Sequence, residues 1–185
     1  VLKQLGCESV ALGFVAGETG KWLERGLAAQ GLQTDFVQLK QGMTRINVKI
    51  KADLETELNG AGPDIPEDAR RAFEEKIDKL TEGDILVLAG SIPASLSQDA
   101  YEKILQRLQG RGVQTVVDAT RDLLARVLPY HPFLIKPNNH ELEELVGVKL
   151  NSDEEIAQAA GYLQKRGARN VLVSMAGDGA MLRDE

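Results

Sequence analysis

The sequence contains a single cysteine, no long apolar run and fewer basic than acidic residues. Cys7 cannot form an internal disulfide, so we expect stability to come from packing and the protein to occupy a reducing compartment, the cytoplasm. No run of about 18 apolar residues occurs, so we expect neither a transmembrane helix nor a membrane partner. With 22 Lys and Arg against 28 Asp and Glu, the formal charge is −6, which argues against nucleic acid as a partner.

Several catalytic motifs are also absent. Residues 17–21 (GETGK) superficially resemble a phosphate loop, but Val15 and Trp22 stand where that motif requires Gly and Ser or Thr. No G-x-G-x-x-G sequence follows a predicted strand, so the usual dinucleotide fingerprint is missing. His131 and His140 lie on different predicted elements, which disfavours a zinc site, and no serine lies in a G-x-S-x-G elbow.

The length of 185 residues and the apolar fraction of 43% are ordinary for one globular domain. The chain opens in the middle of a pattern with Val1 and closes on Asp184 and Glu185. We therefore expect residues 1–185 to be a single, incomplete domain from a longer protein.

From residue 84 onward, apolar runs alternate with amphipathic stretches. A continuous apolar run, typical of a strand covered on both faces, occurs at 85–89, and strands are predicted in the same way at 113–117, 133–135 and 171–173. Helical periodicity covers 98–108 and 153–166, and the second helix begins with the capping pair Ser152 and Glu155. This alternation predicts an α/β fold with a central, mostly parallel sheet flanked by helices.

The first third of the chain has a different pattern. A helix is predicted over 19–30 and a charged helix over 66–80. Between them, residues 45–52 alternate apolar and polar side chains, which predicts a half-buried strand with a cationic polar face. Flanking strand candidates cover 35–39 and 54–58. Together these strands indicate a small β-flap over about 35–59 attached to the parallel core.

Asn138 and Glu141 form the first of three candidate groups for binding or catalysis. They lie three residues apart where a predicted buried strand meets a helix, so both face the same side of the first helical turn. One interpretation is an ordinary helix cap, with Asn138 as N-cap and Glu141 three residues later. The other is that this carboxylate and amide hold magnesium waters and nucleotide phosphates at the carboxyl end of a strand.

The other two groups are a glycine-containing turn and a strand face. Ser174, Gly177 and Gly179 follow the strand at 171–173, where glycines allow close approach to a ligand but equally suit a hairpin turn. Arg45 and Asn47 are two residues apart in a strand, so both could contact one sugar phosphate, and the planar fork of arginine suits phosphate.

Taken in order, these segments resemble the ribokinase-like sugar kinases of the phosphofructokinase B type. The matching stretches extend over nearly the whole chain and comprise residues 42–49, 57–63, 89–93, 116–118, 136–142 and 173–180. Within that family, TRINVK at 44–49 and KPNNHEL at 136–142 are most similar to kinases that phosphorylate fructose 1-phosphate, followed by kinases of tagatose 6-phosphate. The resemblance implies a ribokinase-like fold with a β-lid over the sugar site, where the flap at 35–59 falls.

The resemblance also implies a role for each candidate residue, with ATP and magnesium as cofactors. Arg45, Asn47 and Ser91 would bind the sugar phosphate. Contacts to the nucleotide would come from Lys136, Asn138, Ser174, Gly177 and Gly179, and metal contacts from Glu141 and Asp118. The implied reaction is in-line transfer of the γ-phosphoryl group of ATP to a sugar hydroxyl, giving fructose 1,6-bisphosphate from fructose 1-phosphate.

Two signatures of that family do not occur in the sequence. Its sugar-binding aspartate belongs before Val1, and the aspartate that acts as catalytic base belongs after Glu185. We therefore assign no catalytic residue within the chain and expect the isolated chain to be inactive. A different class of function, a non-catalytic module that senses sugar phosphate or nucleotide, stays open. The exposed strand edges of the flap also favour a homodimer through the lid.

Overall fold

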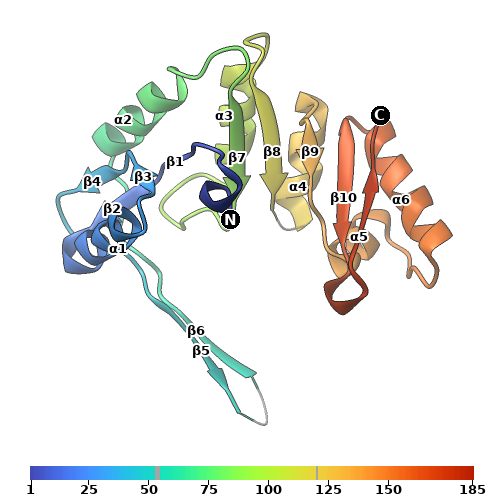
Figure 1. The fold of residues 1–185 in the computed structure, drawn as a ribbon, viewed down its shortest axis with the longest axis horizontal. Coiled ribbons are helices and arrows are strands. Elements are labelled where there is room, and N and C mark those ends of the chain that lie inside the picture. Colours follow the sequence, from blue (N-terminus) through green and yellow to red (C-terminus); the bar gives the residue numbers. More distant parts are fainter. Residues whose placement is uncertain (53–54, 120) are drawn as a thin grey trace. The chain divides into compact units, whose positions relative to one another are not determined.

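The computed structural model describes residues 1–52, 55–119 and 121–185, which form two compact units (Figure 1). Unit 1 contains residues 1–76 and 93–96, and unit 2 contains residues 77–92 and 97–185. Among the described residues, no helix combines the length and apolarity needed to cross a bilayer. The expectation of a single domain over 1–185 stays a prediction.

Unit 1 is built from a helical turn, short strands and two helices. In order, its elements are η1 (Lys3–Leu5), β1 (Val10–Ala11), β2 (Phe14–Ala16), α1 (Gly17–Ala29), β3 (Gln33–Thr34), β4 (Val37–Leu39), β5 (Asn47–Lys51), β6 (Glu55–Asn59) and all but the last residue of α2 (Glu67–Ile77). β1 pairs with β3 and β2 with β4, both in parallel. A small core of Ala16, Val37, Leu39, Ile65 and Ala69 packs β2 and β4 against α2 and the segment that precedes it.

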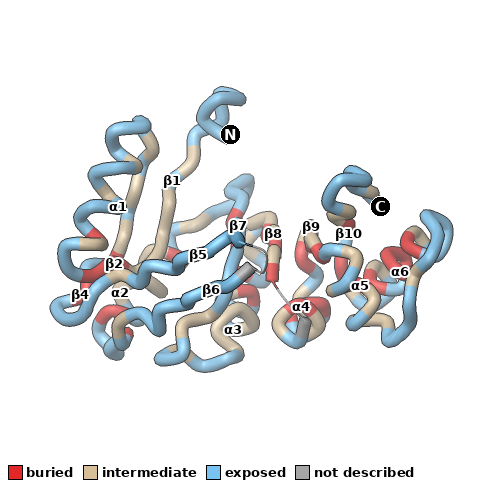
Figure 2. Tube along the Cα trace, turned by 90° about the horizontal axis from the view of Figure 1, so that it is seen from below, coloured by how far each residue is buried: buried red, intermediate tan, exposed pale blue. Residues whose placement is uncertain are grey.

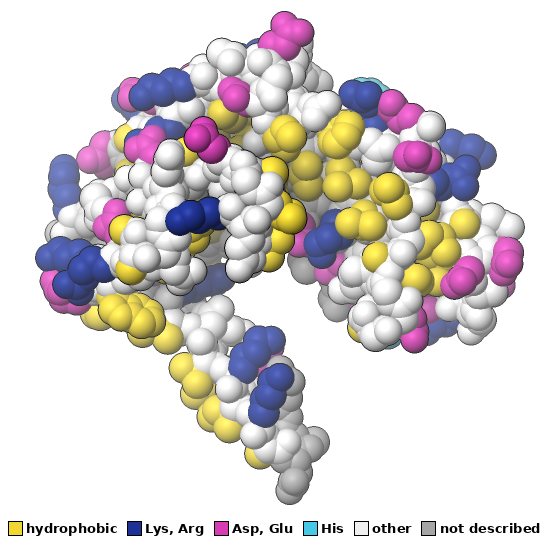
Figure 3. Space-filling view, viewed as in Figure 1, with side chains coloured by type: hydrophobic (Ala, Val, Ile, Leu, Met, Phe, Trp, Pro, Cys, Tyr) yellow, Lys and Arg dark blue, Asp and Glu magenta, His cyan; other side chains and the backbone are white. Residues whose placement is uncertain are grey.

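The hairpin of β5 and β6 differs from the strand that the alternating pattern predicts. The two strands pair antiparallel, from Asn47 opposite Asn59 to Lys51 opposite Glu55. Val48, Ile50 and Leu58 are 45%, 48% and 58% exposed, so the expectation of a half-buried strand was wrong. Apolar and polar side chains do alternate, but no other described element covers the apolar side of the hairpin. Figure 3 shows the apolar side chains in yellow along one edge of the hairpin, opposite the dark blue cations.

The hairpin is also shorter than the predicted flap. The strand expected over 35–39 is present as β4, but it pairs with β2 in a different sheet. Of the strand expected over 54–58, Leu54 lies outside the described residues, and β6 accounts for the remainder. The register of β4 is set by the hydrogen bond from the Val37 amide to the Gly13 carbonyl, a contact 24 residues away that no local pattern encodes.

Unit 2 is an α/β layer structure. Its elements are β7 (Ile85–Ala89), α3 (Ala100–Leu108), β8 (Gln114–Asp118), α4 (Arg121–Val127), η2 (Leu128–Tyr130), β9 (Leu134–Ile135), α5 (Asn139–Val146), α6 (Asp153–Lys165), β10 (Asn170–Ser174), η3 (Ala176–Asp178) and β11 (Ala180–Arg183). The strands form one sheet in the order β11-β10-β9-β8-β7, parallel except for β11. The predicted α/β fold with a mostly parallel sheet is confirmed.

The helices of unit 2 pack on one face of this sheet, as Figures 1 and 2 show. In the strands of this sheet, Leu86, Leu88 and Val117 are buried. Ile85 and Val87 alternate with them and are 61% and 54% exposed. Coverage of this strand on both faces, which its continuous apolar run predicts, is therefore not seen within the described residues.

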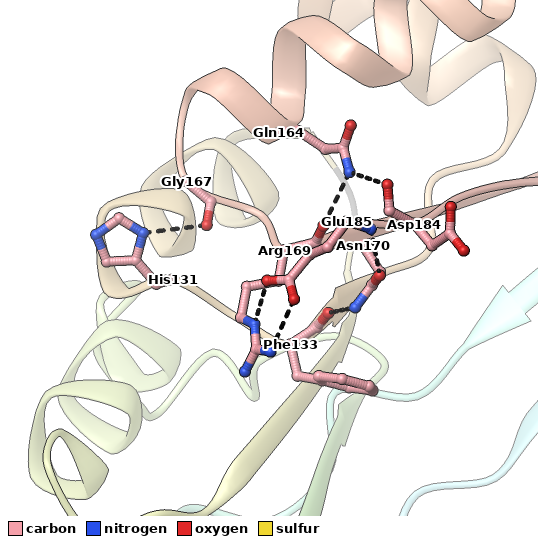
Figure 4. A network of polar contacts seen from close by, with 8 residues as sticks. All are labelled: His131, Phe133, Gln164, Gly167, Arg169, Asn170, Asp184 and Glu185. Carbon is pink, nitrogen blue, oxygen red and sulfur yellow. Dashed lines mark hydrogen bonds and ion pairs between the residues drawn. The ribbon is translucent and has the colours of Figure 1, made fainter.

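A polar network fixes the edge of the sheet where β10 begins and β11 ends (Figure 4). Asn170 donates to the Phe133 carbonyl at 2.8 Å and accepts from the Glu185 amide at 3.2 Å. Gln164 donates to the carbonyls of Arg169 and Asp184, both at 2.9 Å. These contacts join α6, the start of β10, the residues that follow β11 and the approach to β9 at the amino-terminal edge of β9 and β10.

Candidate functional site

The carboxyl ends of the parallel strands gather most of the predicted residues of unit 2. Asp118 is the last residue of β8, Lys136 directly follows β9, and Ser174 is the last residue of β10. An isolated parallel bridge pairs Asn138 with Ser174, and the Ser174 amide donates to the Pro137 carbonyl at 3.0 Å. Because the strands are parallel, their ends meet at one edge, where α/β sheets bind ligands.

An ion pair lies at the centre of this edge. The Lys136 ammonium is 3.1 Å from a carboxylate oxygen of Asp118, and both side chains are about two-fifths exposed, at 37% and 42%. The Lys136 amide also donates to the Val117 carbonyl at 3.1 Å, which fixes the backbone that carries the ammonium. A partly exposed ion pair contributes little stability, so the Lys136 ammonium can exchange its contact with Asp118 for a contact with an incoming phosphate at a small cost in free energy.

The turn after β7 is attached to the same edge. The Gly90 amide donates to the Asp118 carbonyl at 3.2 Å, and the Tyr101 hydroxyl donates to the Gly90 carbonyl at 3.1 Å. Burial, together with the nearby negative charge of Asp118, raises the pKa of Tyr101 above its ordinary value, so the hydroxyl stays protonated as a donor. Ser91, one of the three residues predicted to bind the sugar phosphate, is the next residue and is exposed.

Asn138 and Glu141 cap helix α5 reciprocally. The Asn138 side-chain oxygen accepts from the Glu141 amide, and the Glu141 carboxylate accepts from the Asn138 amide, both at 2.9 Å. The structure therefore confirms that Asn138 and Glu141 cap the helix. This cap is compatible with a second role, because only one carboxylate oxygen of Glu141 takes part in this reciprocal hydrogen bond.

Residues 174–180 form the connection of the antiparallel hairpin β10–β11. Ser174 pairs with Ala180, and the Met175 amide donates to the Gly179 carbonyl at 2.8 Å. Gly177 lies in η3, and Gly179 has a φ of 97°, a conformation that favours glycine. The hairpin interpretation of this segment is thus correct, and the turn leaves Gly177 and Gly179 exposed beside Ser174.

Arg45 and Asn47 belong to unit 1. Arg45 lies two residues before β5, and Asn47 is the first residue of that strand, so both lie at the root of the hairpin. A Cβ atom at Gly60 would lie 3.4 Å from the Arg45 Cβ, which shows that the backbone leaving β6 packs against the base of this arginine. Both side chains are exposed.

The magnesium prediction concerns Asp118 and Glu141. Within residues 1–52, 55–119 and 121–185, no three His, Cys, Asp or Glu side chains gather closely enough to hold an ion by themselves. This donor set suits magnesium that arrives with ATP, because Mg²⁺ keeps several waters and usually takes one or two carboxylates together with phosphate oxygens. The assignment of Asp118 and Glu141 as contacts to metal-bound water stays a prediction.

Two residues near these positions had not been predicted. Tyr101 anchors the turn that carries Ser91. Thr44 precedes Arg45, and the amide, the carbonyl and the hydroxyl of Thr44 each form a hydrogen bond. Tyr101 appeared in the sequence only as one apolar position of a helical stripe. Thr44 is the first residue of the family-like stretch at 44–49, but it precedes the alternating pattern, so only the folded contacts show what its side chain does.

An α/β sheet with this polar carboxyl edge, joined in sequence to an arginine-bearing hairpin, agrees with the family to which the sequence is matched. The chain belongs to the pfkB family of carbohydrate kinases, whose profile matches residues 1–185. It is 46% identical over 182 residues to a 1-phosphofructokinase from Bacillus subtilis, covering 98% of this chain and 60% of that protein.

Two further similarities bear on the substrate and on the fold. The chain is 35% identical over 185 residues to a D-tagatose-1-phosphate kinase from Bacillus licheniformis, covering all of this chain and 60% of that protein. The crystal structure of phosphofructokinase-2 from Escherichia coli in complex with fructose-6-phosphate matches with a TM-score of 0.90 at 27% identity, covering all of this chain and 62% of that one. The chain thus spans about three-fifths of the length of these proteins.

Proposed function

We propose that these 185 residues are part of a longer, cytoplasmic kinase that transfers the γ-phosphoryl group of ATP to fructose 1-phosphate, giving fructose 1,6-bisphosphate. The observation that carries this proposal is the carboxyl edge of unit 2, where Lys136, Asp118, Asn138 and Ser174 meet at the ends of three neighbouring strands. Its chemistry suits a triphosphate with magnesium, and the similarity to a 1-phosphofructokinase supports the choice of sugar.

Within this proposal, the residues divide into three tasks. Arg45, Asn47 and Ser91 bind the sugar phosphate, with the guanidinium on the phosphate. Lys136 and Asn138 contact the ATP phosphates, while Ser174, Gly177 and Gly179 border the nucleotide. Glu141 and Asp118 face magnesium through water, and the metal supplies charge neutralisation for the phosphates. Phosphoryl transfer depends mainly on positioning and charge, so no covalent nucleophile is needed from the chain.

The test is a comparison of kcat/KM for candidate sugar phosphates with the full-length kinase and magnesium-ATP. We expect fructose 1-phosphate to give the highest value, and no turnover by the isolated 185 residues. A full-length protein that consumes ATP with no sugar phosphate dependence would contradict the proposal. Turnover by the isolated chain would contradict its incompleteness.

A second candidate substrate is tagatose 1-phosphate, the substrate named for the Bacillus licheniformis relative. Fructose 1-phosphate and tagatose 1-phosphate carry the phosphate at the same carbon, so Arg45 could serve both in the same way. The candidate taken from the sequence, tagatose 6-phosphate, presents its phosphate at the other end of the sugar and stays a prediction. Including both tagatose phosphates in the kinetic comparison separates these cases. Binding of sugar phosphate without turnover would instead indicate the non-catalytic sensing module.

We also propose that the hairpin β5–β6 pairs with the same hairpin of a second copy. Its apolar side chains Val48, Ile50 and Leu58 are exposed, and the same hairpin of a second copy would bury them without the need for a different protein. The matched variants Ile50→Ser and Lys51→Ser introduce the same residue at neighbouring positions on opposite faces. By sedimentation, we expect I50S to be a monomer and K51S to remain a dimer. If both variants keep the mass of the wild type, the hairpin is not the interface.

A further inference from the structure

Thr44 immediately precedes Arg45 and is held by three hydrogen bonds. Its amide donates to the Ala16 carbonyl at 2.9 Å, and its hydroxyl oxygen accepts from the Ala16 amide at 2.8 Å. Its carbonyl accepts from the Thr19 hydroxyl at 2.8 Å. Thr44 is therefore bound through its amide, its carbonyl and its side chain to the corner where β2 turns into α1.

The corner that receives Thr44 is buried and closely packed. Ala16 is 1% exposed and belongs to the core of unit 1. A Cβ atom at Gly20 of α1 would lie 3.0 Å from the Thr44 hydroxyl oxygen and 3.0 Å from the Val15 Cβ. Helix α1 can approach Thr44 this closely because Gly20 has no side chain, and the close packing leaves little space around the Thr44 hydroxyl.

The return strand of the hairpin is packed at the same place. Gly42 has a φ of 85°, and a Cβ atom there would lie 2.7 Å from the Pro63 Cβ. Gly60 and Gly62, which follow β6, approach the base of Arg45. Both ends of the hairpin are thus fixed at its root, although the hairpin itself is exposed along its length (Figure 2).

We propose that Thr44 is a positioning residue that fixes the backbone of Arg45, and so the placement of the guanidinium, for binding the sugar phosphate. An exposed arginine on a hairpin loses conformational entropy when it binds phosphate, and a fixed backbone reduces that cost. The Thr44 hydroxyl touches no part of the substrate in this account; it acts through Arg45. The inference rests on the proposed function, since it requires a sugar phosphate at Arg45.

The test uses four forms of the full-length kinase. Thr44→Val keeps the shape of the side chain but leaves the buried Ala16 amide without its acceptor, whereas Thr44→Ser keeps the hydroxyl. Thr34→Val, in β3 of the same unit, makes the same change at a side chain with no hydrogen bond among the described residues, and is the matched control. For each form, KM is measured separately for fructose 1-phosphate and for ATP, together with the melting temperature and amide exchange at Ala16.

We expect T44V to raise KM for fructose 1-phosphate about tenfold, because one buried hydrogen bond is lost, while KM for ATP changes less than about twofold. Exchange of the Ala16 amide should accelerate in T44V. T44S and T34V should keep both KM values within about twofold of the wild type. A merely structural role would instead lower the melting temperature and leave the ratio of the two KM values unchanged.

The outcomes separate this inference from the proposed function. An active wild type whose T44V variant keeps the wild-type KM for fructose 1-phosphate overturns the role of Thr44 and leaves the proposed function standing. An increase in both KM values, or an equal increase in T44S or T34V, also overturns it. A wild type with no activity on any sugar phosphate overturns the proposed function and this inference together.

Discussion

A variant of Glu141 separates the cap that the structure shows from the magnesium contact that we propose. Glu141→Gln keeps an oxygen that can accept from the Asn138 amide, as the carboxylate does at 2.9 Å, and glutamine occurs as readily as glutamate in this capping arrangement. The negative charge in the first turn of α5 is lost, which costs about 0.3–1 kcal/mol of helix stabilisation. A pure cap would therefore respond with a small loss of stability and no other change.

The magnesium role predicts a larger and different effect. Removing a group that orients metal-bound ligands typically lowers metal affinity about 10–100-fold, which is roughly 1.4–2.8 kcal/mol. We therefore expect the concentration of free Mg²⁺ that gives half-maximal rate to rise by about 10–100-fold in E141Q of the full-length kinase. The assay is the initial rate against free Mg²⁺ at constant ATP and saturating fructose 1-phosphate.

Glu155 provides the matched control for this experiment. It occupies the corresponding position in α6, where its amide donates to Ser152 at 3.2 Å and its carboxylate accepts from the Asn151 amide at 2.7 Å. Glu155→Gln therefore removes the same charge from the same kind of helix start, outside the predicted site. We expect E155Q to share the small stability loss and keep the wild-type magnesium curve. Superimposable magnesium curves for wild type, E141Q and E155Q would leave Glu141 as a cap alone.

Three further predictions address binding, packing and acid stability. Arg45→Ala in the full-length kinase should cost about 1.5–3 kcal/mol of sugar phosphate binding, seen as a higher KM for that substrate but not for ATP; an unchanged KM would remove Arg45 from the site. Leu163 is fully buried in α6, so Leu163→Ala should lower the free energy of unfolding by about 2–5 kcal/mol in denaturant titrations, and a loss below about 1 kcal/mol would show that this core collapses around the gap. A hydrogen bond from Lys149 and, to a smaller extent, one from the Leu150 amide hold the pKa of Glu143 below its ordinary value. Because the unfolded chain then binds the proton more readily, this stabilisation is present above the ordinary pKa and is lost as the pH falls through the lowered one. Melting temperatures should thus fall more steeply below about pH 5 in wild type than in Glu143→Gln, and parallel curves would contradict the assignment.

The sequence predicted most accurately what local interactions decide. Helix α6 follows the expected range closely because Ser152 caps its start and its apolar stripe is buried, with Ile156 and Leu163 in the core. The strand at 85–89 is β7 over the same residues, since a short apolar run between polar turns leaves little choice of boundary. The Asn138–Glu141 cap was also accessible, because both partners lie within one helical turn.

Interactions between distant parts of the chain escaped prediction. The pairing of Lys136 with Asp118 depends on the register of β8 against β9, and the pairing of β4 with β2 depends on a similar choice. The exposure of β5 was predicted wrongly for the same reason. The alternating pattern shows that the strand has an apolar and a polar face, but it does not show whether another element covers Val48 and Ile50. Thr44 shows the limit most clearly, because its three contacts lie 25 to 28 residues away in a segment without periodicity.

Product identification by phosphorus NMR tests the proposed reaction most directly. The full-length kinase is incubated with fructose 1-phosphate and magnesium-ATP, and the spectrum is followed as ATP is consumed. Our account predicts a second phosphate ester on the sugar, at carbon 6, in equal amount to the ADP formed. ADP appearing with inorganic phosphate, and no new ester signal, would contradict it.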